Sequence, residues 1–336
     1  MIRKLLLGFV LVLVISTAYY LHSHRARRTL DVAYAANREV TLWSSSAQIR
    51  EEVATVSYGE RLEIIDRYLD QVEVRTKSGV TGWTTLANLL SGDLWQKAEE
   101  LNKTVAALPV EARGRTRVLS NLHLDPSRDS PRIRQLAKAA PVELFERRAV
   151  EVPTQPRAAN ETEEKSDEPE EAKKEDWWLV RAQAPGENAL SGWVLGRFVD
   201  LDVPAPLPDY ASAAGMRIIA WFELNRVADS SGAAKPQYLV VGARGAEGQA
   251  CDFTLLRVFT WSKARQRYET AFVESDVCGK LPMKLTLAEQ PKREEFFAFE
   301  DRSTGVPFER TYQMRDNVAR RVKAPGLMAT EKRKHE

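Results

Sequence analysis

The sequence predicts a mainly β protein: two small barrels, then a C-terminal antiparallel β-meander or sandwich domain, with a hydrophobic helix at the N-terminus. Short stretches that alternate apolar and polar residues recur along the chain, as half-buried strands do. A strand, a turn and a Gly-Trp pair occur within Gln71–Leu89 and again within Trp178–Val199, which indicates one small β module used twice. The run Leu5–Leu21 is almost uncharged and predicts the helix.

Length and composition limit the classes of protein. The chain has 336 residues, room for two or three domains, and its 43% hydrophobic content is that of a folded protein. Its 49 basic and 47 acidic residues nearly balance, which argues against a nucleic-acid binder. The expected boundaries are 1–30 for a signal anchor or signal peptide, 37–91 for the first barrel, 92–112 for a linker helix, 113–203 for the second barrel, 213–322 for the C-terminal domain and 323–336 for a disordered tail.

The N-terminal run favours export. A membrane span needs roughly 20 apolar residues, so Leu5–Leu21 is at the short end. The alternative is a cleaved signal peptide, with Arg3 and Lys4 as its basic start and Ser16 and Ala18 before the cut. Both alternatives predict a cell-envelope protein outside the cytoplasm, either anchored in the inner membrane through this helix or periplasmic or secreted.

The cysteines agree with an exported location. Cys251 and Cys278 belong to no C-x-x-C pair and the four histidines are scattered, so no metal site is predicted. In an oxidising compartment the two cysteines are expected to form a disulfide. The alternative is two buried thiols.

The first repeat resembles a known domain family. Its strand signals begin near Asn37, and the Val56–Gly59 step, Arg61–Ile65, Val72–Arg75 and Gly82-Trp83 follow in the order of bacterial Src-homology-3 (SH3) domains. One departure is Gln71, which stands where the family often has a Trp. The resemblance implies a small closed barrel that binds a peptide or a protein partner.

The second copy is longer. Arg117–Leu124, Pro141–Arg147, Trp177–Arg181 and Gly192–Val194 fill the same places, and an insert at 153–176 interrupts them. The Glu161–Asp176 part of this insert carries nine acidic residues and three lysines, a net charge of −6. The insert has almost no large apolar residue, so it is predicted to be disordered. It could be an acidic docking arm, but a solvated loop at a hairpin tip is favoured.

Two further regions complete the prediction. Leu94, Trp95, Ala98, Leu101, Val105 and Leu108 recur at helical spacing, so residues 92–112 are expected to pack as an amphipathic helix, with Trp95 in the core. The last third has seven strand signals joined at hairpin distances. They are residues 217–224, 237–241, 252–260, 267–273, 284–287, 295–299 and 309–314.

Six aromatic residues are candidates for a shallow groove that stacks on a peptide or a glycan: Trp43, Tyr68, Trp83, Trp177, Trp178 and Trp193. The alternative is packing in the core or at its rim, which is favoured for Trp83 and Trp193. Trp177 and Trp178 are adjacent, so a strand sends one to each face, and one of them is expected to be exposed.

No motif predicts catalysis. The glycines of Gly242–Gly248 are followed by a strand and not by the helix start that a phosphate loop needs, and no Gly-x-Ser-x-Gly motif occurs. We therefore expect no enzyme and no cofactor, but a non-catalytic envelope scaffold that binds peptidoglycan peptide or an envelope protein through its SH3-like domains. One alternative is an envelope hydrolase, or its regulatory subunit, with a site in the C-terminal β domain. Another is an intracellular scaffold, held inside by the arginines after Leu21.

Overall fold

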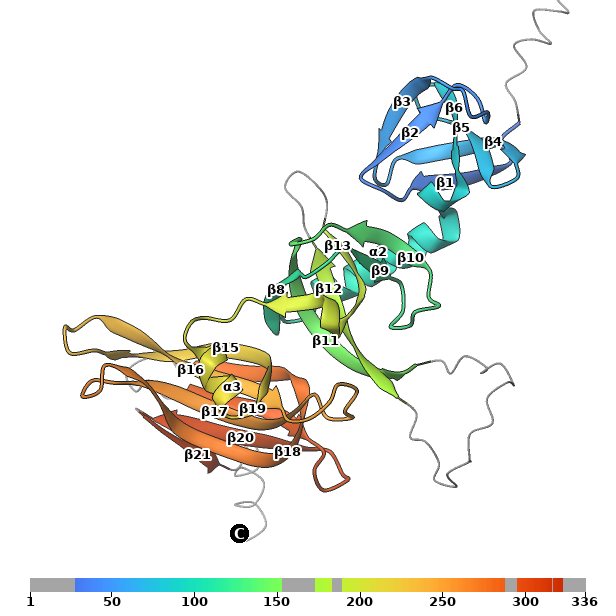
Figure 1. Cartoon of the computed structure of the whole chain (residues 1–336). Coiled ribbons are helices and arrows are strands. Elements are labelled where there is room, and N and C mark those ends of the chain that lie inside the picture. The colour runs from blue at the N-terminus through green and yellow to red at the C-terminus, as the bar shows by residue number, and fades with distance from the viewer. Residues whose placement is uncertain (1–27, 153–172, 183–188, 288–294, 316, 323–336) are drawn as a thin grey trace, which may run out of the picture. The chain divides into compact units, whose positions relative to one another are not determined.

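A computed structural model describes residues 28–152, 173–182, 189–287, 295–315 and 317–322 (Figure 1). It confirms the mainly β fold, with strands arranged in three antiparallel seven-stranded sheets. The chain divides into two compact units, residues 1–96 and 97–336. The predicted N-terminal anchor or signal peptide and the predicted C-terminal tail lie outside the described residues, as does most of the acidic insert. Within the described ranges, no helix is long and apolar enough to cross a membrane.

The first module, residues 31–91, is a curled sheet with strand order β3-β2-β6-β5-β4-β1-β7. Its strands are β1 (Asp31–Ala35), β2 (Glu39–Trp43), β3 (Glu52–Ser57), β4 (Arg61–Tyr68), β5 (Gln71–Arg75), β6 (Thr81–Thr85) and β7 (Leu89–Ser91), with a 3-10 turn at Leu86–Asn88. The prediction missed β1, which pairs with both β4 and β7. Small and branched apolar side chains from six strands, such as Ala33, Leu42, Leu62 and Val74, fill the core of the curled sheet.

Helix α2 (Gly92–Ala106) follows the first module. The Ser91 hydroxyl accepts a hydrogen bond from the Leu94 N–H (3.2 Å) and so caps its first turn. Within the first unit, the ring of Trp95 stacks on Tyr34 at a centroid distance of 4.7 Å. The prediction that Trp95 packs within the molecule is therefore confirmed.

The second module, residues 112–201, repeats the arrangement of the first. Its sheet has the order β10-β9-β13-β12-β11-β8-β14, which matches the first sheet strand for strand. Its strands are β8 (Ala112–Thr116), β9 (Ser120–His123), β10 (Arg132–Leu136), β11 (Pro141–Glu151), β12 (Lys174–Ala182), β13 (Leu190–Leu195) and β14 (Val199–Leu201), with a 3-10 turn at Gly196–Phe198.

The two modules also agree in detail. In the first, Glu63 faces Arg75 across β4 and β5 and forms an ion pair of 2.7 Å. In the second, Glu143 faces Arg181 across β11 and β12 at 2.6 Å. The register of β4 and of β11 shifts at the residue pair that follows, so both strands bulge at the same place. We therefore treat residues in the same register positions as equivalent.

Close strand approach explains the repeated Gly-Trp pair. A Cβ atom on Gly82 would lie 2.8 Å from the Leu42 Cβ, and one on Gly192 would lie 2.6 Å from the Leu122 Cγ. A side chain at either position would collide with the neighbouring strand, so only glycine fits.

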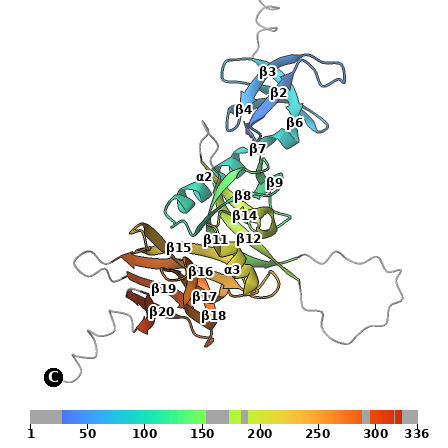
Figure 2. The ribbon, with the colours of Figure 1, turned by 60° about the vertical axis from the view of Figure 1, so that its left-hand side comes forward.

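The C-terminal sheet is a meander, as predicted, because its seven strands follow each other in chain order (Figure 2). They are β15 (Arg217–Ala228), β16 (Ala234–Ala243), β17 (Phe253–Ser262), β18 (Arg267–Leu287), β19 (Glu295–Asp301), β20 (Phe308–Arg315) and β21 (Val318–Val322). Two predicted strands are one long strand, β18, and the prediction missed β21. Helix α3 (Leu207–Ala213) packs Leu207 and Ala211 against Tyr238 and Phe259 of this sheet.

The two cysteines form the predicted disulfide. Cys251 lies just before β17 and Cys278 lies within β18, and their sulfur atoms are 2.08 Å apart. The bond therefore joins the start of one strand to its neighbour in the C-terminal sheet.

Candidate functional site

Two of the predicted groove residues meet on the first module. Trp43 of β2 is paired directly with Trp83 of β6, so both rings lie on the same face of the sheet. Both are half-buried, and the Arg50 guanidinium lies over the Trp43 ring at 4.7 Å. Gln71 continues this face because β5 pairs with β6. Its Oε1 atom is buried and has no hydrogen-bond partner among the described residues.

The end of this face is apolar and exposed. Tyr68 is paired with Gln71 and is 60% exposed, and Leu69 in the adjoining turn is 88% exposed. Leu69 has φ +53°, a left-handed conformation that Gly, Asn or Asp adopts more easily than a leucine. We call Trp43, Trp83, Gln71, Tyr68 and Leu69 together the Trp43–Trp83 face.

The remaining three predicted residues are buried in the second module. The exposed fractions are 2% for Trp177, 6% for Trp178 and 4% for Trp193. The prediction that one of the adjacent pair is exposed is therefore wrong. Alternation does send them to opposite faces, but neither face of this strand is open. Trp177 packs in a cluster with Trp193 and Val105 of α2, while Trp178 lies on the opposite face together with Val180, which is 0% exposed.

The buried face of the second module is equivalent to the Trp43–Trp83 face of the first. Trp193 takes the place of Trp83, and Trp177 takes the place of Gln71. In the second module, Leu101 and Val105 of α2 cover this face, and the Asn102 side-chain amide donates to the Ala189 carbonyl (2.7 Å). The same sheet face is thus a helix-packing surface in one module and is half-exposed in the other.

A second candidate site lies inside the second unit, between β11 and the C-terminal sheet. Arg147 of β11 has a side chain that is 1% exposed. It forms ion pairs with Asp176 (2.5 Å) and Asp252 (3.2 Å), and it donates to the carbonyls of Gln249 and Cys251. Lys280 forms a second ion pair with Asp252 (3.0 Å). These contacts hold the loop before β17 against the second module.

The position of two acidic residues corrects the predicted insert. Glu175 and Asp176 were assigned to a disordered loop, but they belong to β12 and are 4% and 2% exposed. Glu175 forms ion pairs with Arg128 and Arg197, and its hydrogen bond from Arg128 lowers its pKa. Arginine partners make burial of these carboxylates possible.

One more acidic group is buried at the same junction. Glu111, just before β8, is 2% exposed, and its Oε2 accepts the N–H of Met283 in β18 (3.0 Å). Burial raises the pKa of this carboxyl to about 7, against the opposing effect of the Met283 hydrogen bond. The nearby Asp252 carboxylate raises it further.

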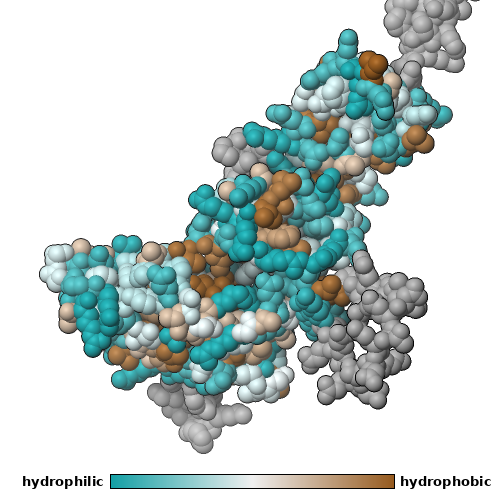
Figure 3. All heavy atoms as spheres, in the orientation of Figure 1, coloured by the Kyte–Doolittle hydropathy of each residue, from teal (hydrophilic) through white to brown (hydrophobic). Residues whose placement is uncertain are grey.

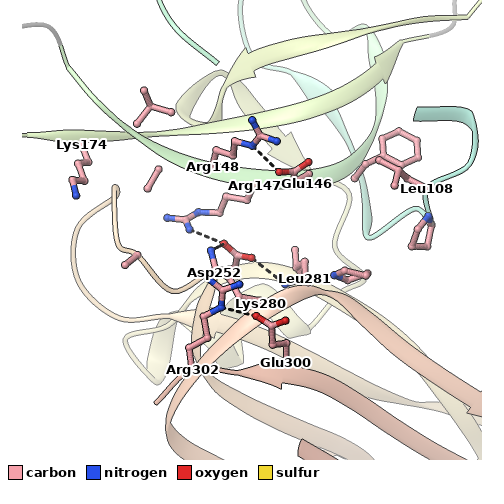
Figure 4. Close-up of a pocket in the computed structure, with 16 residues that line it drawn as sticks. Leu108, Glu146, Arg147, Arg148, Lys174, Asp252, Lys280, Leu281, Glu300 and Arg302 are labelled. Carbon is pink, nitrogen blue, oxygen red and sulfur yellow. Dashed lines mark hydrogen bonds and ion pairs between the residues drawn. The ribbon is translucent and has the colours of Figure 1, made fainter. Parts of the chain in front are cut away.

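A cavity of about 580 Å³ adjoins these charges. Figure 4 shows Arg147 and Asp252 pointing toward each other across the junction, with the Arg148–Glu146 and Arg302–Glu300 pairs on either side. The carboxylates lining the cavity are Glu146, Asp252 and Glu300, and each forms an ion pair with a neighbouring cation.

The described residues offer neither a metal site nor an available histidine. No group of three His, Cys, Asp or Glu side chains there has a geometry that could hold a metal ion. His123 is engaged in packing, since its Nδ1 lies 2.8 Å from the Ser130 carbonyl and its ring meets Trp177 edge-on. Most of the surface turned to the viewer in Figure 3 is hydrophilic, with small groups of hydrophobic residues.

The junction between β11 and the C-terminal sheet was not predicted from the sequence. Arg147 and Asp252 are 105 residues apart in the chain, so no local spacing relates them. One local signal was present. Asp176 directly precedes the predicted Trp177–Arg181 strand, and extending that strand by one residue places Asp176 on the same face as Trp178.

Comparison with known proteins leaves the family unassigned. No protein-family model matches the chain, and no curated protein is significantly similar to it. One similar solved structure is NlpC2 from Trichomonas vaginalis, at 9% identity and a TM-score of 0.18 over 54% of this chain. The match spans 52%, about half, of that protein. Another is an NlpC/P60 family protein from Bacillus cereus ATCC 10987, at 11% identity and a TM-score of 0.22 over 71% of this chain and 93% of that one. These scores are too low to relate the fold or the function of this chain to theirs.

Proposed function

We propose that this chain is a non-catalytic binding protein of the cell envelope, and that its Trp43–Trp83 face binds cell-wall peptide. The observation that carries the proposal is the difference between two equivalent faces. In the second module the face is filled by α2, and Trp177 and Trp193 are fully buried. In the first module the face keeps two half-buried tryptophans and an exposed apolar end.

The chemistry of this face suits a peptide ligand. Tryptophan rings give a large contact area at little cost in conformational entropy. Leu69 keeps an apolar side chain in water and in a left-handed conformation, two unfavourable features that a contact with a ligand would explain.

The SH3-like identity and the envelope location belong to the same proposal. Both modules share one strand order, and both contain the glycine-tryptophan pair that is part of the resemblance. The disulfide between Cys251 and Cys278 supports an oxidising compartment. Free, alkylatable cysteines in protein taken from cells would support the intracellular alternative instead.

The hydrolase alternative has less support. It requires carboxylates that converge in a pocket of the C-terminal domain with one of them available as a base. Asp252 and Glu300 do line one cavity, but Asp252 is bound by Arg147 and Lys280, and Glu300 by Arg302. Carboxylates paired in this way serve structure more readily than proton transfer.

The proposal is tested by sedimentation of the full-length protein with purified cell-wall sacculi. Trp43→Ala and Trp83→Ala should abolish retention. Trp261→Ala is the matched control, because Trp261 is also half-buried and carries Lys235 over its ring at 4.9 Å, but lies in the C-terminal sheet. This control should be retained like the wild type.

A further variant separates binding from folding. Leu69→Asn places a residue that tolerates positive φ at an exposed position, so we expect unchanged or slightly higher stability together with weaker retention. If the folded wild-type protein is not retained, wall binding is refuted and a protein partner becomes the ligand to seek. If Trp261→Ala loses retention as fully as Trp83→Ala, the Trp43–Trp83 face is not the site.

A further inference from the structure

The cavity at the junction has the features of a second binding site, separate from the Trp43–Trp83 face. One side is formed by residues 146–150 of β11 and the other by residues 280–282 of β18, with Leu108 and Pro109 at one end (Figure 4). Its volume of about 580 Å³ falls within the range of about 300–1,000 Å³ that is usual for ligand sites.

One buried donor at this cavity has no acceptor. The two terminal nitrogens of Arg147 are occupied by Asp176, Asp252 and backbone carbonyls. Its Nε–H is buried, and no described residue accepts its hydrogen bond. Arg147 is itself a lining residue, with a side chain 1% exposed. Because this nitrogen is inaccessible to solvent, Arg147 forms part of the cavity wall, and the donors open to a ligand are those of the partly exposed Lys280, Arg148 and Arg302.

The charges around the cavity favour an anion. Five cations line it, Arg147, Arg148, Lys174, Lys280 and Arg302, against the three carboxylates already named. Asp176 and Glu151 pair with Arg147 and Lys174 from outside the lining, so Lys280, Arg148 and Arg302 are the cations that face a ligand. The Lys280 ammonium has three donors and gives one of them to Asp252. The Arg148–Glu146 and Arg302–Glu300 ion pairs are half-exposed, so each contributes little free energy. Arg148 and Arg302 can therefore exchange these partners for a ligand carboxylate.

The apolar lining and the shape of the site indicate an extended ligand. Phe145, Val150, Leu281 and Pro282 give the cavity apolar walls. An adjoining hollow of about 260 Å³ shares Lys280, Leu281, Pro282 and Glu300 with it and continues to Phe308. Two hollows that share these lining residues suit an extended chain better than a compact molecule.

We propose that this junction binds the C-terminal carboxylate of an extended peptide. The carboxylate would accept hydrogen bonds from Lys280 and Arg302, and an apolar side chain of the peptide would lie against Leu281 and Pro282. This site is independent of the proposed function of the first module, because the two sites share no residue.

The test follows Met283, which adjoins Pro282 and is 6% exposed. The full-length protein carries five methionines. With 13C-labelled methionine methyl groups, the Met283 resonance is titrated with a pool of N-acetylated tripeptides of mixed sequence that have free carboxylates. A matched pool with C-terminal amides replaces the carboxylate with a neutral carboxamide. Met216 and Met314, which are buried elsewhere in the C-terminal domain, serve as internal controls of fold.

We expect saturable movement of the Met283 resonance with the acid pool only. Lys280→Gln should weaken this binding on the order of tenfold, because it removes a charge-assisted hydrogen bond. Arg302→Gln, at an exposed position, should weaken it less. Lys263→Gln, at an exposed turn of the same sheet, should have no effect.

Three results would overturn the proposal. The first is no movement of Met283 with either pool, which would mean that the cavity holds water only. The second is equal binding of acid and amide pools, which would mean that the carboxylate is not recognised. The third is equal weakening by Lys263→Gln and Lys280→Gln, which would indicate diffuse charge attraction in place of a built site.

Discussion

Replacing Glu111 by Gln tests whether a buried acid makes the junction sensitive to pH. The carboxyl is 2% exposed and accepts one hydrogen bond, from the Met283 N–H. Glutamine keeps an acceptor for this N–H but cannot ionise. The substitution therefore removes the titration and preserves the contact.

The magnitude follows from the pKa. Burial raises the pKa of Glu111 from its ordinary value of 4.5 to about 7 in the folded protein. The folded state thus holds the proton more tightly than the unfolded state does. Stability from this group is fully present below pH 4.5 and is lost as the pH rises toward 7. At about 1.4 kcal/mol per pH unit, the loss is about 3 kcal/mol.

Urea unfolding at pH 4.5 and pH 8, followed by tryptophan fluorescence, measures the effect. The variant and the wild type should differ little at pH 4.5, and the variant should be more stable by about 3 kcal/mol at pH 8. Glu99→Gln, an exposed position on α2, is the matched control and should track the wild type. A stability difference between Glu111→Gln and the wild type that is the same at both pH values would refute the reasoning.

Three further changes test the packing. Arg147→Met removes the main cation from Asp176 and Asp252 and should destabilise the second unit by about 3–5 kcal/mol in urea unfolding; a loss under about 1 kcal/mol would contradict the role of the cluster. Gly192→Ala forces a Cβ to within 2.6 Å of Leu122 and should cost about 1–3 kcal/mol, read as a lower melting temperature; an unchanged one would contradict the close approach. Reducing the disulfide, which spans 27 residues, should cost about 3.5 kcal/mol, and equal unfolding curves with and without reductant would refute its contribution.

Much of the fold was predictable because each module follows local rules. Alternating residues marked most strands, and the repeated Gly-Trp pair identified the duplication. The first strand of each module was not identified, since β1 buries only the alanines Ala33 and Ala35 and β8 has the sequence ARGRT. Such short strands carry little apolar signal of their own, and their place depends on pairing with neighbours.

The candidate sites were less predictable. Alternation shows which residues share a face of a strand. It does not show which other parts of the chain cover that face. One of Trp177 and Trp178 was expected to be exposed, yet Trp177 packs in a cluster with Val105, 72 positions earlier in the chain. The cavity likewise depends on Arg147 and Asp252, which only the folded chain brings together. Non-local packing of this kind leaves no mark in the periodicity of a sequence.

The disulfide also limits how far the chain extends under tension. When a protein is pulled from both ends, unfolding releases contour length. The bond holds the Cα atoms of Cys251 and Cys278 4.9 Å apart, although 27 residues separate them. Those residues would otherwise extend to roughly 90 Å. In a stretching experiment, the fully extended length of the oxidised protein would therefore be shorter by about that amount. β17 and the part of β18 up to Cys278 would carry no load.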